Sequence, residues 1–566
     1  MAYDLVIRGG TIVDGSGSPP RTGDVALDEG RIAAVGTVDG QARRTVDADG
    51  AIVTPGFVDV HCHYDGQATW ESRMTPSSWH GVTTVIMGNC GVGFAPVRPG
   101  DRERLVELME GVEDIPGTAL HEGLTWEWES FPEYLAVLER HRWDVDVGAQ
   151  VPHGALRLYV MGERGAARQD ATDDDIEQMG RLAREAVEAG AFGFSTSRTR
   201  NHRTSRGEWT PTLTAAGDEL AGIAAAMAAS GRGVLQVVSD FAQFEEEMAT
   251  VLSMAASSGR PLSISLAQND HRPDDWRRIL RAIADANGRG LQVTAQVASR
   301  PVGLLLGLQA TIDPTRTSAI GRALAGRPLE ERVARLRDPD VRAQVAAEMA
   351  AARAPFRWDK VFVLGDPPNY EPPPEDSLAA MAERAGVAPE VLALEHLVSG
   401  EGRGFLYVPF LNYAEGNLDA VACMLADEHS VLGLGDGGAH VGTICDASFQ
   451  TTMLTHWVRD RDRGQRLELS QAVAKQTSMT AAMAGLGDRG VLRPGFKADL
   501  NVIDLDRLRL RAPTMAFDLP AGGKRLLQRA EGYLHTFVSG VETYCDGEHT
   551  GALPGRLVRG PQPAPA

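Results

Sequence analysis

Two histidines separated by one residue form the strongest chemical signal in the sequence. His61 and His63 close an apolar stretch that begins at Val53 and contains a Pro-Gly turn. Side chains at positions i and i+2 of a β-strand share a face, so both imidazoles can bind one metal ion. A pair of surface histidines is the alternative interpretation. Their place at the end of a strand favours a metal site.

A glycine-rich segment near residue 436 predicts the catalytic base. Asp436 and His440 lie in Gly433–His440, directly after a short apolar run. An Asp at a strand end can contact both a metal ion and its bound water, and it can accept the proton as hydroxide attacks. The alternative is an Asp that caps the next turn. His440 is predicted to bind substrate or to support the metal ligands, with a simple loop histidine as the alternative.

Cys90 is the third predicted type of metal ligand. It lies in Gly88-Asn89-Cys90-Gly91 after a second apolar strand. A thiolate there is a suitable soft ligand for Zn²⁺, although a free Cys is more often a packing residue. Cys62 should point away from the face that His61 and His63 share, because it lies between them.

Two further residues at strand ends are predicted to contact substrate. His153 follows a third apolar strand and could donate a hydrogen bond to a developing oxyanion. Arg198 follows a fourth and, with Arg200 and Arg203, could bind an anionic group. The alternatives are a loop histidine with satisfied hydrogen bonds and an exposed Arg-rich loop.

Eight apolar strands alternate with helical stretches, which is typical of a parallel sheet with crossover helices. Eight such units predict an α/β fold of the (β/α)₈ barrel type, in which chemistry collects at the carboxyl ends of the strands. The expected strands are Ala51–His61, Val82–Met87, Val145–Val151, Ala191–Phe194, Val234–Val238, Leu262–Leu266, Leu291–Val297 and Val431–Leu434. The expected helices include Ala183–Glu188 and Arg277–Ala286.

Both ends of the chain are rich in short β-segments. Tyr3–Gly9 and Thr11–Val13 meet at Gly-Gly, which predicts a hairpin, and a second hairpin is expected at Asp28-Glu29-Gly30. Ala498–Ile503 and Tyr533–Tyr544 have the same character. We therefore expect one small β-sandwich built from both termini.

These patterns predict the domain boundaries. Residues 1–54 and 485–558 would form the β-sandwich, residues 55–484 the barrel, and residues 559–566 a flexible Pro/Ala-rich tail. A segment near 303–427 is too long for one crossover helix. It contains a charged helical stretch, Pro328–Arg353, and a Pro-rich loop, so it is interpreted as an insertion near the active-site face.

Composition excludes several classes of protein. The 566 residues are 43% hydrophobic and 23% charged, with 56 Lys and Arg against 76 Asp and Glu, a formal net charge of −20. Such an acidic chain lacks the basic surface that nucleic acids and anionic membranes require. The sequence shows neither an apolar run of about 18 residues nor a secretory leader. Five scattered cysteines indicate a reducing compartment, so a cytoplasmic location is predicted.

Together these motifs resemble the amidohydrolase superfamily, and within it the N-acyl-D-amino-acid deacylase (D-aminoacylase) branch. The resemblance extends over nearly the whole chain. It is carried by Asp4–Gly10, Pro55–Asp59 leading to the two histidines, Gly81–Thr84 leading to Cys90, His153-Gly154 followed by Leu156-Arg157, Gly193–Thr196, Asp436-Gly437, Gly490–Gly495 and Ala498–Leu500. The resemblance implies that Cys90 binds zinc, that His61 and His63 form a second, often weaker metal position, and that Asp436 is the catalytic base.

Departures from the family pattern modify the expected site. No Lys precedes Lys360, which excludes the carboxylated Lys that bridges two metals in many relatives. The histidines expected on strands five and six are missing, and the Lys expected beside the latter is Gln268. Water could replace Cys90 as a ligand, and four other side chains could substitute for the missing histidines: Asp240, Asp270, His271 or His202. The Arg expected in the loop after strand eight is absent, since the corresponding segment, Ala439–Gly442, contains no Arg. One Zn²⁺ ion is therefore expected rather than two, with another divalent metal as an alternative. The side chains that would bind a substrate carboxylate in the family are missing.

The predicted function is hydrolysis of a C–N amide bond in an N-acyl compound, such as an N-acyl-D-amino acid, by metal-activated water with Asp436 as base. Three alternatives remain: a cyclic-amide hydrolase, another reaction on the same barrel such as decarboxylation or ester hydrolysis, and a scaffold that has lost its chemistry. The expected partner is a small-molecule substrate. The insertion could shape the pocket or contact a second subunit, which leaves a homo-oligomer open.

Overall fold

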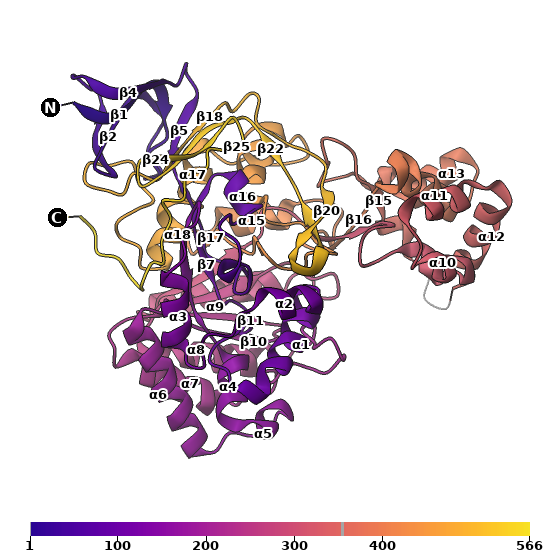
Figure 1. The fold of residues 1–566 in the computed structure, drawn as a ribbon, viewed down its shortest axis with the longest axis horizontal. Coiled ribbons are helices and arrows are strands. Elements are labelled where there is room, and N and C mark those ends of the chain that lie inside the picture. Colours follow the sequence, from indigo (N-terminus) through magenta and orange to yellow (C-terminus); the bar gives the residue numbers. More distant parts are fainter. Residues whose placement is uncertain (1, 353–355, 566) are drawn as a thin grey trace.

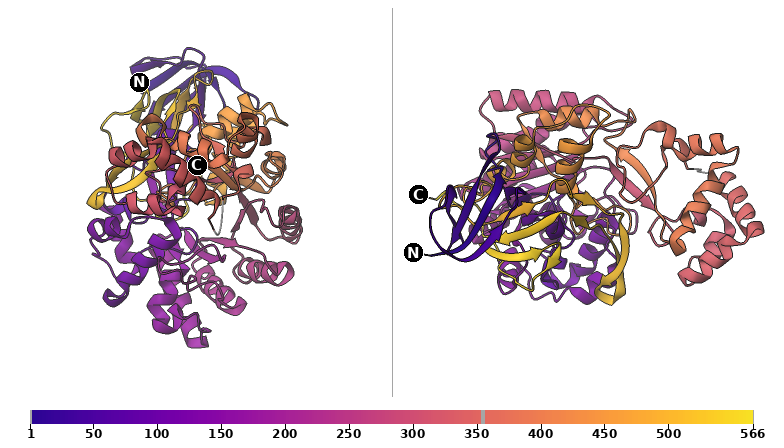
Figure 2. Two further views of the ribbon diagram at one scale, coloured as in Figure 1. Left: turned by 90° about the vertical axis from the view of Figure 1, so that its right-hand side faces the viewer. Right: turned by 90° about the horizontal axis from the view of Figure 1, so that it is seen from above.

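The computed structural model describes residues 2–352 and 356–565 (Figure 1). Within these ranges, none of the helices combines the length and the apolar content that a membrane span needs. The chain forms a terminal β-sheet, a central α/β region and a helical insertion, seen from two further sides in Figure 2.

The two ends of the chain share one nine-stranded sheet, where the sequence predicts a small β-sandwich built from both termini. Its order is β25-β24-β23-β18-β5-β1-β2-β3, with β4 paired to β1. The bounds are β1 Tyr3–Ile12, β2 Arg21–Asp28, β3 Arg31–Gly36, β4 Ala42–Asp47, β5 Ile52–Pro55, β18 Leu500–Ile503, β23 Tyr533–Val538, β24 Val541–Cys545 and β25 Glu548–His549. Two smaller hairpins follow β18, formed by β19 Arg509–Leu510 with β22 Ala530–Glu531 and by β20 Thr514–Leu519 with β21 Gly523–Leu527.

The hairpin predicted at Gly9-Gly10 is wrong. β1 runs through both glycines as one strand, and its register with β2 shifts between Ile7 and Gly10. Gly9 has φ +66, so it forms a bulge rather than a turn. The hairpin predicted at Glu29-Gly30 is present between β2 and β3.

The central region contains parallel strands with crossover helices, so the α/β prediction is confirmed. The strands form a sheet of three, β6-β7-β8, and a sheet of six, β17-β13-β12-β11-β10-β9, rather than one continuous ring. Gln150 alone separates β8 from β9. The bounds are β6 Phe57–Asp59, β7 Val82–Met87, β8 Asp146–Ala149, β9 Val151–Pro152, β10 Gly193–Arg198, β11 Val234–Ser239, β12 Leu262–Leu266, β13 Val293–Val297 and β17 Ser430–Leu432.

The expected strand Ala51–His61 is divided at Gly56. β5, before Gly56, belongs to the terminal sheet, whereas β6, after it, belongs to the central region. A Cβ atom at Gly56 would lie 2.2 Å from Thr83 Oγ1, so the close approach of the two regions requires glycine there.

Helices surround the parallel strands in Figure 1. The predicted stretches near 183 and 277 lie within α6 and α9. A capping box at Thr172 begins α6, and Gly190, with φ +116, ends it. The helices here are α1 Arg102–Glu113, α2 Gly117–Gly123, α3 Phe131–Glu139, α4 His153–Met161, α5 Glu163–Ala166, α6 Asp173–Ala189, α7 Gly217–Ala228, α8 Phe244–Ser258, α9 Asp275–Gly288, α15 Asp419–Ala426, α16 Phe449–Thr452, α17 Leu469–Ala474, α18 Ser478–Met483 and a π-helix, η8, Met453–Asp460.

The insertion leaves the central region on one strand and returns on another. β14 Val302–Leu306, β16 Leu406–Leu411 and β15 Phe362–Val363 form a small antiparallel sheet. Beyond it, helices with their own apolar core project away from the rest of the molecule (Figures 1 and 2). They are α10 Ala319–Leu324, α11 Leu329–Arg337, α12 Pro339–Ala350, α13 Leu378–Ala385 and α14 Pro389–Leu397. The predicted helical stretch corresponds to α11 and α12, and Arg353 lies outside the described residues.

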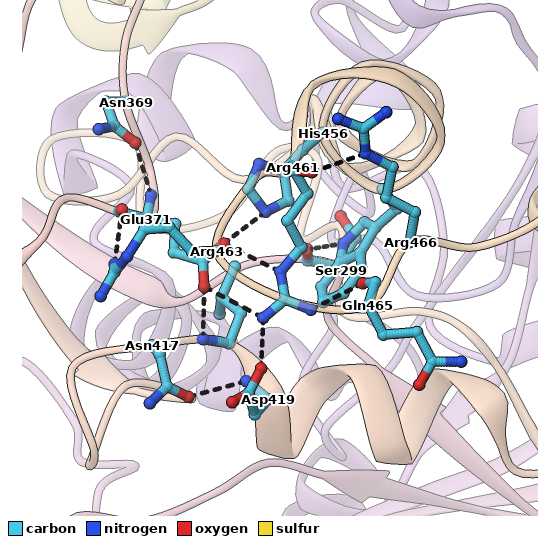
Figure 3. A network of polar contacts seen from close by, with 12 residues as sticks. Ser299, Asn369, Glu371, Asn417, Asp419, His456, Arg461, Arg463, Gln465 and Arg466 are labelled. Carbon is cyan, nitrogen blue, oxygen red and sulfur yellow. Dashed lines mark hydrogen bonds and ion pairs between the residues drawn. The ribbon is translucent and has the colours of Figure 1, made fainter.

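A buried ionic network ties the returning loop of the insertion to the central region (Figure 3). Both carboxylate oxygens of Glu371 accept hydrogen bonds from Arg461, at 3.1 and 3.2 Å. Arg461 also donates to Asp419, and His456 Nε2 lies 2.9 Å from Glu371 Oε2. Glu371 and Arg461 each have several partners, which fixes the loop.

The predicted flexible tail is instead packed against the chain. Gln562 forms a parallel bridge with Leu486, and its amide donates to the carbonyl of Gly485 at 2.9 Å. Backbone hydrogen bonds of this kind hold a Pro-rich segment that composition alone marks as loose. Ala566 lies outside the described residues.

Candidate active site

A pocket of about 370 Å³ is lined by residues from the carboxyl ends of several central strands. It brings together all four predicted metal ligands. Cys90 Sγ lies 3.3 Å from His61 Nε2, and Asp436 Oδ1 lies 3.4 Å from His61 Nε2 and 3.6 Å from His63 Nε2. The donor atoms of His61, His63 and Cys90 all lie within 4.8 Å of one another. Three separate segments therefore converge on one point.

The donor set fits a metal ion such as zinc. Zinc binds imidazole nitrogen, carboxylate oxygen and thiolate sulfur in a tetrahedron, with bonds of about 2.0–2.3 Å. Two ligand atoms on such a tetrahedron are about 3.3–3.6 Å apart by geometry. The three measured separations of 3.3, 3.4 and 3.6 Å have this size.

Two side chains behind the histidines orient the imidazole rings. The Nδ1 atom of His61 lies 2.6 Å from Gln296 Oε1, and the Nδ1 atom of His63 lies 3.2 Å from Glu113 Oε1. Each ring therefore directs Nε2 towards Cys90 and Asp436. Acceptors placed behind histidine ligands in this way fix the tautomer and the ring orientation of metal sites.

Strained backbone accompanies three of the predicted site residues. Cys90, Asp436 and His440 all have φ between +46 and +54, in the left-handed region that non-glycine residues seldom adopt. The amide of Asp436 donates to the carbonyl of His61 at 3.1 Å, and His63 donates to Gly437 at 2.7 Å. These bonds hold the strained loop against the first strand, which is typical of functional sites.

Burial and neighbouring charges perturb the protonation of the cluster. Burial lowers the pKa of His61 to about 4 and raises the pKa of the Cys90 thiol to about 11. Burial opposes charge on Asp436 as well, but the hydrogen bond from His63 and the charges of both histidines hold its pKa far below the ordinary range. Asp436 is therefore an anion. Metal binding by Cys90 requires loss of the thiol proton.

The three predicted substrate-binding residues lie in different places. His440 lines the pocket, with Nε2 at 3.6 Å from Glu113 Oε2. His153 is fully buried outside the pocket lining, and its ring nitrogens contact Thr196 and Glu219, each at 2.9 Å. Arg198 is also absent from the lining, because its guanidinium pairs with Glu247. His153 and Arg198 therefore contact other protein side chains, and neither lines the pocket where the predicted contact with substrate would occur.

Several residues around the site were missed from the sequence. Glu113 lines the pocket from the end of α1, where no local pattern marks it as functional. Outside the lining, Gln236 on β11 accepts a hydrogen bond from the Cys90 amide at 2.9 Å, and Gln296 on β13 holds His61. Both glutamines interrupt apolar strands, which is a signal that sequence reading could have used. His202, which the sequence offers as a substitute ligand, does line the pocket, and burial lowers its pKa to about 3, so its imidazole is neutral.

Comparison with known proteins agrees with this geometry. A model described as "Amidohydrolase family" matches residues 44–549. The chain belongs to the amidohydrolase family. Within the family it falls in the D-aminoacylase-like branch, and it is a hydrolase that acts on carbon–nitrogen bonds other than peptide bonds.

Two relatives from Alcaligenes xylosoxydans xylosoxydans illustrate the branch. D-aminoacylase is 27% identical over 98% of this chain and 97% of its own length. N-acyl-D-glutamate deacylase is also 27% identical, over 98% of this chain and 96% of its own length. This amidohydrolase therefore spans nearly the full length of both relatives.

Two solved structures are similar to nearly the whole chain. A D-aminoacylase with a binuclear metal centre has a TM-score of 0.65 and 25% identity, covering 98% of this chain and 100% of the other. N-acyl-D-glutamate deacylase from Bordetella bronchiseptica, in complex with zinc and a phosphonate inhibitor, has the same TM-score and identity, covering 99% and 100%. Both of these similar proteins bind metal, and the residues that converge in this chain suit a metal.

Proposed function

We propose that this amidohydrolase cleaves the amide bond of an N-acyl compound and that His61, His63, Cys90 and Asp436 hold one divalent metal ion, preferably zinc. The observation that carries the proposal is the convergence of these four side chains on one side of a pocket, with three donor pairs at 3.3–3.6 Å. The missing histidines on strands five and six favour one ion. β11 and β12 line the pocket through Ser239, Asp240, Ser265 and neighbouring residues, none of which is a histidine.

The roles of the side chains follow from their positions. When bound, the metal supplies a water of lowered pKa and polarises the substrate carbonyl. Asp436 lies with Oδ1 towards both histidines, and its second oxygen can accept the proton of the attacking water. The same carboxyl group can then return that proton to the leaving nitrogen. Glu113 and Gln296 keep the imidazoles aligned throughout.

We further propose that the two parallel sheets make up one distorted (β/α)₈ barrel. A parallel bridge between Cys62 and Gly437 joins the end of the first strand to the segment after the last one. Gln150 alone separates the strands at the other junction. Both junctions support a ring in which the site residues meet at the carboxyl ends.

Hydrolysis of matched substrates tests this function. Protein reconstituted with zinc is incubated with N-acyl compounds and with esters of the same acyl group, and release of amine and alcohol is measured. The proposal predicts amine release that chelation abolishes and zinc restores. Cleavage of the esters alone, or no amine release from any N-acyl compound by the metal-loaded protein, would contradict it.

A further inference from the structure

The insertion supplies one wall of the active-site pocket, and this wall is apolar. Val302 and Leu304 on β14 and Phe410 and Leu411 on β16 all line the cavity. Val302 pairs with Leu411 and Gly303 pairs with Pro409, so Phe410 is the extra residue of a β-bulge. A bulge redirects side chains, which explains why the adjacent residues Phe410 and Leu411 both line the pocket.

Phe241 extends the apolar surface from the loop after β11. It is buried and has φ +47, a strained conformation for an aromatic residue. Its amide donates to Ser239 Oγ at 3.1 Å, and its carbonyl accepts from Arg272 Nη1 at 2.9 Å. These contacts hold Phe241 in the wall despite the strain.

Arg272 is therefore engaged in holding this loop. Its Nη2 donates to the carbonyl of Asp240 at 2.6 Å, and its Nη1 lies 3.2 Å from Asp275 Oδ2 as well as donating to Phe241. Among the residues that the structure describes, Arg272 is the only Arg or Lys lining the pocket. No uncommitted guanidinium or ammonium group of the described lining is left for a substrate carboxylate.

The carboxylates of the pocket add to this effect. Of the four in the lining, Glu113 and Asp436 belong to the proposed metal cluster, where a bound ion would offset their charge, which leaves Asp240 and Asp275. His440 is already opposed by Glu113, with Nε2 at 3.6 Å from Oε2. A substrate carboxylate at the apolar wall would lose hydration beside Asp240 and Asp275 without gaining a cationic partner from the described lining, which is costly.

From this wall and these committed charges we infer that the pocket selects neutral, apolar N-acyl amides over N-acyl amino acids that carry a free carboxylate. The inference rests on the proposed function and specifies its substrate class. Phe410, Leu411, Leu304 and Phe241 determine the specificity by covering the apolar part of the substrate. In this respect the chain differs from relatives whose names specify acidic N-acyl amino acids.

A pair of substrates that differ only in the carboxylate tests the inference. N-hexanoyl-D-norleucine and its decarboxylated counterpart N-hexanoylpentylamine are compared with the zinc-loaded enzyme, and binding of both to metal-free protein is measured by calorimetry. We expect the neutral amide to have at least a tenfold higher kcat/KM, and to bind more tightly. Extending the acyl chain should raise kcat/KM about three- to fourfold per methylene until the wall is covered.

Variants of the wall sharpen the test. Phe410→Ala should lower kcat/KM for the neutral amide by about tenfold, through lost apolar contact. Leu304→Lys should shift the ratio of the two substrates towards the carboxylate, because it places a cation in the pocket. The control is Val363→Ala on β15 of the same small sheet, which is exposed and leaves the lining intact. Circular dichroism melting checks that each variant folds.

The possible results distinguish the proposed amide hydrolysis from the inferred preference for neutral substrates. If neither compound is hydrolysed but the neutral one alone binds, the proposed function fails and the pocket's preference stands. If both are hydrolysed and the carboxylate is preferred or equal, the function stands and the inference is overturned. Tighter binding of N-hexanoyl-D-norleucine to the metal-free protein would also overturn it.

Discussion

Two buried polar clusters of this amidohydrolase have opposite character. In the network at Glu371, both carboxylate oxygens contact Arg461, and one of them also lies beside His456 (Figure 3). In the active-site pocket, His61 and His63 direct Nε2 towards Cys90 and Asp436, which is a set of electron-pair donors. Glu113 Oε2 has no hydrogen-bond partner among the described residues.

The difference separates a structural cluster from the proposed active site. At Glu371, each anion meets a cation at hydrogen-bond distance, so the cluster is complete as it stands. Around His61, the donors face one another at separations set for an ion between them. Perturbed groups at such a point are typical of a catalytic site.

The largest expected effect is on catalysis. Asp436→Asn keeps the shape of the side chain but removes the proton acceptor, so kcat for amide hydrolysis should fall by about 10²–10⁴-fold. Steady-state kinetics with zinc-loaded protein measures this, with Asp462→Asn at an exposed position as the matched control. Retention of more than about a tenth of kcat would show that Asp436 is not the base.

Breaking the complete cluster should affect stability. Arg461→Met leaves the buried Glu371 carboxylate without its main partner, so the free energy of unfolding should drop by about 3–5 kcal/mol. Denaturant unfolding measures the drop, compared with Arg335→Met on the exposed face of α11. An equal effect of the two substitutions would mean that the network does not stabilise the fold.

A smaller effect, on metal affinity, is expected from the side chain that contacts His63. Glu113→Gln weakens the acceptor that orients His63, so metal affinity should fall by about 10–100-fold. Competition with a chromophoric chelator measures the affinity. Glu103→Gln, exposed on the same helix, is the control, and unchanged affinity in Glu113→Gln would rule out an orienting role for Glu113.

The smallest expected effect is a change in the melting temperature with pH. Burial opposes charge on Glu371, but His456 and Arg461 outweigh it and lower its pKa from 4.5 to about 2. A depressed carboxyl pKa stabilises the folded state above pH 4.5, and that stability is lost as pH falls towards 2. The difference in melting temperature between wild type and Glu371→Gln should therefore shrink as the pH is lowered from 4.5. A constant difference would contradict the shift.

The sequence predicted the parts of the site that follow strands. His61, His63, Cys90 and Asp436 each come directly after an apolar run, and the carboxyl ends of parallel strands meet. Glu113 was missed because it reaches the pocket from a helix end, where tertiary packing alone decides its neighbours. His153 also follows a strand, but its ring turns towards Glu219, a contact that no local pattern encodes.

Prediction of the fold from the sequence has the same limit. The terminal sheet and the α/β region follow from hydrophobic periodicity, whereas the bulge at Gly9 depends on the partner strand. The apolar wall of the pocket likewise depends on how β14 and β16 pair, since Val302 and Leu411 are more than 100 residues apart. Long-range register of this kind cannot be obtained from one sequence.

Metal content tests the central claim most directly. The purified protein, reconstituted and desalted, is analysed by inductively coupled plasma mass spectrometry beside His61→Ala and a control, His535→Ala, from a second His/Glu/Cys cluster on the terminal sheet. We expect about one equivalent of zinc or another divalent metal in the wild type and in His535→Ala, and loss of it in His61→Ala. No metal in the reconstituted wild type, or equal metal in His61→Ala, would mean that His61 and its neighbours do not hold a metal ion.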